Sequence, residues 1–116
     1  LLSGLDFVYL HMEAPDECGH QGDVAHKIYA IEQIDGVVKC VCDRLSAAGE
    51  AFRLLLLPDH PTPVALRTHT RDAVPYLLYD STRAAEGALS YDEDTAAATG
   101  RKFAKGRDLF DFFIKG

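Results

Sequence analysis

The sequence predicts an α/β fold in which a mostly parallel sheet is flanked by helices. A β-branched and aromatic segment at residues 6–12 indicates a first strand, and a long helical stretch separates it from an apolar run at residues 52–57. A strand, a helix and a second strand in this order favour a right-handed crossover between parallel strands. The unbroken apolar run at 52–57 suits a strand buried on both faces, as parallel sheets require.

The helical stretch between these two strands is predicted at residues 23–48. Its apolar residues recur every three or four positions, which predicts one buried stripe along the helix. Gly49 stands where a helix stop is expected. The residues of the predicted stripe are Val24, Ile28, Ile31, Ile34, Val38, Val41 and Leu45.

The remaining segments are shorter. Residues 13–22 contain Pro15, Gly19 and Gly22, which indicate a polar loop after the first strand. A third strand is predicted at 73–79, where Pro75 favours a strand start or an edge. A loop at 81–90, a short helix at 92–99 and a terminal helix at 106–115 follow. In the terminal helix, Leu109, Phe110 and Phe113 are expected to face inward.

Three strands are too few for a complete parallel sheet with helices on both faces. The sequence also opens at Leu1 without an initiator Met and enters the first strand segment almost at once. We therefore expect the rest of the sheet to lie upstream, in a longer protein of which this chain is the C-terminal portion.

Composition excludes several partners. The net charge of −6 and the pI near 5.2 argue against nucleic acid and anionic membranes, which favour a basic face. The apolar run at 54–57 is too short to span a bilayer, and the first residues show no basic stretch followed by an apolar one, so no signal peptide is expected among them. Cys18, Cys40 and Cys42 show no metal or disulfide spacing, so reduced thiols and a cytoplasmic location are expected.

Aspartate and histidine residues lie in the loops next to all three predicted strands, after the first two and before the third. The loops at the carboxyl ends of parallel strands converge on one crevice, so these residues are expected to meet there. Imidazole nitrogen and carboxylate oxygen together suit manganese, zinc, iron or cobalt. Each pair taken alone fits a turn or capping role as well. The candidate metal ligands are Asp16, His20, Asp59, His60 and His69.

Several segments together resemble the archaeal-type cofactor-independent phosphoglycerate mutases of the alkaline phosphatase superfamily. These segments are residues 11–23 (HMEAPDECGHQGD), 57–63 (LPDHPTP), 67–70 (RTHT) and 72–76 (DAVPY). The tail around Tyr91 and Thr99 is similar as well. The resemblance covers essentially the whole chain in the same order and spacing.

The resemblance implies an alkaline phosphatase-like sheet and a site for two divalent ions, manganese foremost, with zinc, cobalt or magnesium as alternatives. Asp16, His20 and His69 would bind one ion, and Asp59 and His60 the other. A nucleophilic serine, which would carry the phosphoryl group between 3-phosphoglycerate and 2-phosphoglycerate, and a cap region are expected upstream of residues 1–116. Arg67 is a candidate contact for phosphate or the glycerate carboxylate, and an exposed structural arginine is the alternative.

Two other functions stay open at this point. One is another phosphoesterase or phosphomutase of the same superfamily, which shares the ligand pattern. The other is a metal-binding module without catalysis. In either case a truncated sheet would expose apolar edges, so self-association of the isolated chain is expected.

Overall fold

The computed structural model describes residues 3–83 and 87–116, and the chain divides into two compact units. Unit 1 consists of the chain up to Glu50 together with Pro61–Arg71. Unit 2 consists of Ala51–His60 and Asp72–Gly116. The chain therefore passes from unit 2 to unit 1 between His60 and Pro61, and back to unit 2 after Arg71.

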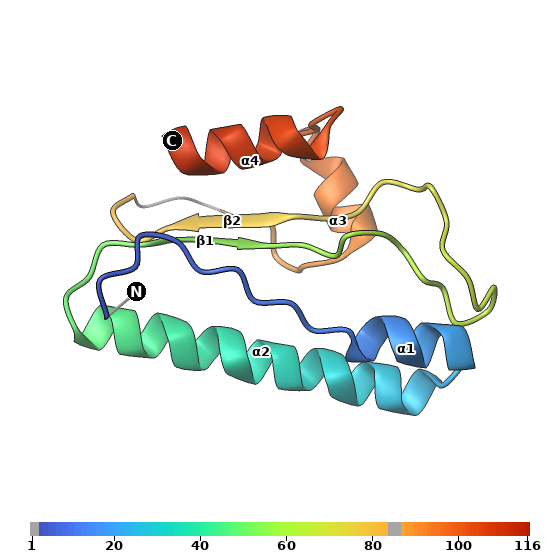
Figure 1. Ribbon diagram of the computed structural model, residues 1–116. Helices are drawn as coiled ribbons and strands as arrows, with labels where there is room; N and C mark the ends of the chain where they lie inside the picture. The colour runs from blue at the N-terminus through green and yellow to red at the C-terminus, as the bar shows by residue number, and fades with distance from the viewer. Residues whose placement is uncertain (1–2, 84–86) are drawn as a thin grey trace. The chain divides into compact units, whose positions relative to one another are not determined.

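Unit 1 is built on a hairpin of two helices, α1 (Ala14–Gln21) and α2 (Val24–Ala47) (Figure 1). Gly22 joins them in the left-handed region, at φ 70°, which glycine adopts without steric cost. The backbone N–H of Asp23 donates to the carbonyl of Cys18, and the Asp23 carboxylate then accepts from the N–H of His26 at the start of α2. These bonds let the chain reverse direction within two residues.

The prediction of a long helix at 23–48 is confirmed by α2, and Gly49 ends it at φ 71°. The prediction that its apolar stripe is buried is wrong for most of its length. Leu45 is buried, whereas Val24, Ile28 and Ile31 are each more than half exposed. The apolar period predicted the helix correctly, but the buried side chains of α2 are those of Leu45 and of the small Ala30, which is not part of the predicted stripe.

Two predictions for the N-terminal segments are wrong. Residues 13–22 form helix α1 for most of their length, because Pro15 lies in the first turn, where it removes no helical hydrogen bond. Residues 6–12 are not a strand, since they pair with no strand in the part of the chain that the structure describes. Leu5, Val8 and Leu10 are correspondingly exposed.

Unit 2 contains the two described strands, β1 (Arg53–Leu56) and β2 (Leu77–Asp80). They pair antiparallel, with Arg53 opposite Asp80 and Leu56 opposite Leu77. β1 confirms the strand predicted at 52–57, and β2 begins four residues later than predicted, beyond Pro75. The expected mostly parallel sheet is thus not present among the described residues, where β1 and β2 form a two-stranded antiparallel sheet.

Helices α3 (Glu93–Ala98) and α4 (Gly106–Lys115) complete unit 2, and α4 runs alongside the two strands (Figure 1). Both were predicted. Leu109 is buried as expected, but Phe110 is about half exposed. Tyr76, Phe103 and Phe112 form a chain of ring contacts with centroids 5.6–5.7 Å apart. Arg53 ties β1 to α4 through a hydrogen bond from Nη1 to the carbonyl of Phe113, 3.1 Å long.

The loop predicted at 81–90 falls partly outside the described residues, as does the start of the chain at residues 1–2. Among the helices that the structure describes, none has the length and apolar character that crossing a membrane requires.

Candidate metal centre

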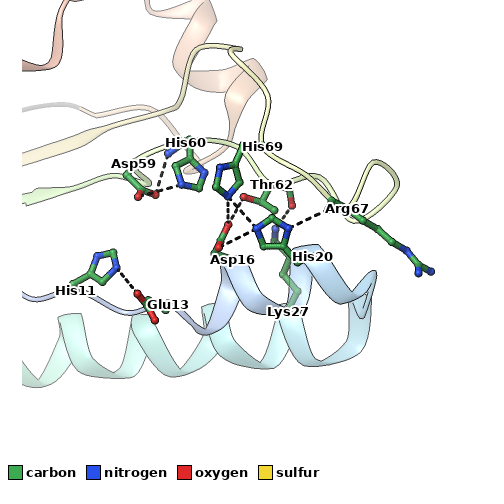
Figure 2. A network of polar contacts seen from close by, with 10 residues as sticks. All are labelled: His11, Glu13, Asp16, His20, Lys27, Asp59, His60, Thr62, Arg67 and His69. Carbon is green, nitrogen blue, oxygen red and sulfur yellow. Dashed lines mark hydrogen bonds and ion pairs between the residues drawn. The ribbon is translucent and has the colours of Figure 1, made fainter.

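Three predicted ligands meet in unit 1. Asp16 and His20 lie four residues apart on α1, so one face of the helix presents both side chains (Figure 2). His69 comes from the loop of Pro61–Arg71. Its Nε2 atom lies 3.3 Å from Asp16 Oδ1, and His20 Nε2 lies 3.3 Å from Asp16 Oδ2. The two Nε2 atoms are 3.0 Å apart.

The hydrogen bond at the far side of His20 assigns its tautomer. His20 Nδ1 lies 3.1 Å from the carbonyl oxygen of Arg67, which can only accept, so the proton is assigned to Nδ1. In the neutral ring Nε2 then carries a lone pair and faces Asp16 and His69. A backbone carbonyl that orients a histidine in this way is usual behind a metal-ligating imidazole.

The arrangement therefore directs several electron-pair donors at one point. One donor atom from each of Asp16, His20 and His69 lies within 4.8 Å of the other two. Such a group is stabilised by a cation among the donors. The side chains of Asp16, His20 and His69 keep 35%, 43% and 49% of their surface exposed, so an ion and a further ligand could reach them from solvent.

The loop that carries His69 is fixed by its own hydrogen bonds. The carbonyl of Pro63 accepts from the N–H groups of Leu66 and Arg67, at 3.0 and 2.9 Å. Thr70 N–H donates to the carbonyl of Pro61, 3.1 Å away. These bonds close a compact turn, which brings His69 back towards α1.

Two further side chains fasten this loop to the helices. The hydroxyl of Thr62 donates to Asp16 Oδ1, and Thr62 is 5% exposed. Lys27 Nζ, from α2, donates to the carbonyl of Thr62 over 2.6 Å. Sequence reasoning missed both contacts, because a threonine between two prolines and a lysine on an amphipathic helix carry no signal of such a role.

Asp59 and His60 belong to unit 2 and lie in the loop between β1, which ends at Leu56, and Pro61. Within this pair His60 N–H donates to Asp59 Oδ1 at 3.0 Å, and His60 Nε2 lies 3.3 Å from Asp59 Oδ2 (Figure 2). The position of the pair after a strand agrees with the sequence analysis. Its approach to Asp16, His20 and His69 stays a prediction.

Arg67 contributes its backbone rather than its guanidinium to the cluster. Figure 2 shows the side chain pointing away from His20, while the carbonyl faces the ring. Arg67 has φ 54°, and among the described residues it is the one non-glycine residue with a positive φ. Its predicted contact with substrate stays a prediction.

The family comparison agrees with this donor set. A family model of the metalloenzyme superfamily matches residues 2–107, which is most of the chain. This chain belongs to the metalloenzyme superfamily. Membership implies the use of divalent metal ions, and Asp16, His20 and His69 form a group suited to one.

Curated relatives carry a more specific name. The 2,3-bisphosphoglycerate-independent phosphoglycerate mutase of Methanothrix thermoacetophila is 46% identical over 99% of this chain and 30% of its own length. That of Methanosarcina acetivorans is 38% identical over 95% of the chain and 28% of its own length. The 2,3-bisphosphoglycerate-independent phosphoglycerate mutase 2 of Methanothermobacter thermautotrophicus is 48% identical over 81% of the chain and 23% of its own length.

This chain thus spans about 30% of the length of the curated relatives that it matches. No solved structure matches it significantly. The similarity to named mutases and the superfamily match agree with the resemblance found in the sequence.

Proposed function

We propose that this chain provides metal ligands to a cofactor-independent phosphoglycerate mutase, which interconverts 3-phosphoglycerate and 2-phosphoglycerate. One observation carries the proposal: the carboxylate of Asp16 and the imidazoles of His20 and His69 converge on one point. The names of relatives with up to 48% identity support the choice of reaction.

The donor set favours a particular kind of ion. One carboxylate oxygen and two imidazole nitrogens suit manganese, zinc or cobalt, and thiolate is not needed. Manganese is the ion we propose, with zinc, cobalt or magnesium as alternatives. Asp59 and His60 would hold a second ion together with ligands from outside this chain.

Charge supports an anionic substrate. A divalent ion bound by one carboxylate and two neutral imidazoles retains one net positive charge, so a phosphate group is attracted to it. When bound, such ions neutralise negative charge on a transferring phosphoryl group and activate an oxygen nucleophile. The residues of this chain would hold the ions in place and leave one side of the site open for the substrate.

The remaining parts of the proposal follow from the same resemblance. The whole enzyme would have a mostly parallel, helix-flanked sheet of the alkaline phosphatase type, with its nucleophilic serine and cap outside residues 1–116. Arg67 would contact phosphate or carboxylate, and the enzyme would act in the cytoplasm. Reduced Cys18, Cys40 and Cys42 are compatible with that compartment.

Metal binding is the first test. Titration of the chain with Mn²⁺, followed by calorimetry and by electron paramagnetic resonance, should show a site that is lost in Asp16→Asn and in His69→Ala. Removal of one of three protein ligands should weaken binding by at least about tenfold. Equal affinity in the parent chain and in both variants would refute the metal site.

Activity is the second test, in a full-length protein that contains this chain. His60→Ala should lower kcat for conversion of 3-phosphoglycerate by orders of magnitude, because a missing ligand misplaces the reacting groups. His26→Ala is the control, since His26 contacts Asp23 at the start of α2 and is exposed. Near-normal turnover in His60→Ala would mean that the Asp59–His60 pair is structural. Hydrolysis of phosphate esters without mutase activity would assign the protein to another branch of the superfamily.

A further inference from the structure

Thr62 has the environment of a residue that orients another group. It is 5% exposed, yet its hydroxyl reaches Asp16, whose side chain is 35% exposed. The bond goes to Oδ1, the same oxygen that lies 3.3 Å from His69 Nε2, whereas Oδ2 faces His20. A donor fixed on one oxygen sets the rotation of the carboxylate plane and thus the direction of its remaining lone pairs.

Thr62 is itself held by Lys27. The ammonium group of Lys27 donates to the Thr62 carbonyl at 2.6 Å, and this contact is partly buried. A charge-assisted bond of this kind is about twice as strong as a bond between neutral groups. Lys27 lies on α2 and Asp16 on α1, so Thr62 is bound to both helices of the hairpin (Figure 2).

Gly19 makes the close approach feasible. It is buried on α1, one residue before His20, and a Cβ there would lie 2.8 Å from Thr62 Cγ2 and 3.0 Å from Lys27 Nζ. Any side chain at position 19 would therefore push Thr62 and Lys27 away from the helix. The absence of a side chain lets the backbone of Thr62 lie directly against the helix that carries Asp16.

We propose that Thr62 is a positioning residue that fixes the Asp16 carboxylate for metal binding, and that Lys27 holds Thr62 in place for this purpose. The inference rests on the proposed metal site at Asp16, His20 and His69. Residues behind a ligand affect metal affinity by about 10- to 100-fold when they are changed. A bond that sets the direction of a carboxylate belongs to this class.

The test is the affinity of the chain for Mn²⁺, measured by calorimetry. Thr62→Val keeps the shape of the side chain and removes the donor, so its Kd should rise by about 10- to 100-fold. Thr62→Ser keeps the donor and should retain most of the affinity. Thr68→Val is the matched control, because Thr68 is exposed on the same loop, and its Kd should equal that of the parent chain.

A second pair of measurements separates positioning from simple stabilisation. The d–d absorption spectrum of bound Co²⁺ reports ligand geometry, and it should change in Thr62→Val and not in Thr68→Val. Lys27 is not a proposed metal ligand, and Lys27→Met removes its ammonium group. This variant should also bind Mn²⁺ more weakly than the parent chain. Urea unfolding of each metal-free variant gives the stability change against which these effects are compared.

The outcomes are distinct. If the parent chain binds Mn²⁺ and Thr62→Val binds it equally well with an unchanged Co²⁺ spectrum, the positioning role is overturned while the metal site stands. The same holds if Thr62→Val lowers stability alone. If Thr62→Val does not fold, Lys27→Met decides, and unchanged affinity there overturns the proposal. If the folded parent chain binds neither ion, the proposed metal site fails and the role of Thr62 fails with it.

Discussion

At Gly19 the space around the Cα atom is too small for a Cβ, so a substitution there is expected to be destabilising. Replacing glycine by alanine inside a helix ordinarily stabilises it by about 1 kcal/mol. At Gly19 we expect the opposite, because the new methyl group would collide with Thr62 and Lys27. Forcing atoms into such a packed contact costs about 1–3 kcal/mol. Gly19→Ala should therefore unfold at lower urea concentration and bind Mn²⁺ more weakly.

Gly36→Ala is the control for this prediction. Gly36 lies in α2, and a Cβ there meets nothing within 4 Å. Its unfolding midpoint in urea should rise. If Gly19→Ala and Gly36→Ala shifted the midpoint in the same direction, the close approach of Thr62 to α1 would be wrong.

Arg67 offers a second prediction at this scale. Its φ of 54° is unfavourable for any residue with a Cβ and most unfavourable for a β-branched one. Arg67→Gly and Arg67→Val both remove the guanidinium but differ in tolerance of this backbone. Arg67→Val should be less stable than Arg67→Gly by about 1–2 kcal/mol, measured by urea unfolding. Equal stability would indicate that the loop adopts another conformation in solution.

Three of the candidate ligands predicted from the sequence, Asp16, His20 and His69, lie together in the structure, whereas no sequence pattern indicated the contact of Thr62 with Asp16. Asp16 and His20 stand four apart, a spacing that places both on one helical face even though the segment was expected to be a loop. Thr62 could not be recognised, because its role depends on a contact 46 positions away along the chain. Such contacts follow from tertiary packing, which a single sequence does not encode by any local pattern.

For helices and strands, the sequence-based prediction is correct where several local signals agree. α2 has a periodic apolar pattern, an Asp23 cap and a Gly49 stop, and all three lead to the same bounds. α1 was missed because proline and glycine normally indicate loops, whereas here Pro15 opens the helix and Gly22 closes it. β2 starts late because Pro75 has no N–H to donate to a neighbouring strand.

The carboxylate of Asp80, at the end of β2, makes the stability of unit 2 depend on pH. Asp80 accepts from the hydroxyl and the N–H of Thr82 at 2.6 and 2.9 Å, and from Arg53 Nε at 3.0 Å. The Thr82 bonds, and then Arg53, lower the pKa of Asp80 from 3.8 to about 2. Because the folded state holds the ionised form, this stabilisation is complete above about pH 4 and is lost as the pH falls towards 2.

The measurement compares the parent chain with Asp80→Asn in urea unfolding experiments at several pH values. The parent should be the more stable of the two at pH 6, and the difference should shrink steadily between pH 4 and pH 2. Arg107→Gln serves as a control from an exposed ion pair on α4. A difference that is constant from pH 6 to pH 2 would mean that Asp80 contributes through its shape and not its charge.

For the whole molecule, the amount of exposed apolar surface is the main consideration. In the described residues only Ala30, Leu45, Phe52 and Leu109 are buried hydrophobic side chains, whereas Phe7, Tyr9, Ile28 and Phe112 are all at least 45% exposed. Water disfavours that much uncovered apolar surface. We expect the purified chain to self-associate, so its sedimentation velocity should depend on concentration at micromolar levels. A monomer at all concentrations would contradict this.

The last prediction concerns catalysis by the 116-residue chain. It should not convert 3-phosphoglycerate to 2-phosphoglycerate, even with Mn²⁺. Transfer requires an oxygen nucleophile held in line with the phosphoryl group and a pocket that retains the glycerate while it turns. The hydroxyl of Thr62 lies against one of the ligands, but it is buried and already donates to Asp16. The resemblance implies a serine elsewhere for the nucleophile. A coupled assay with a full-length relative as control measures this directly. Turnover by the chain within about a hundredfold of the control would mean that a residue of this chain accepts the phosphoryl group.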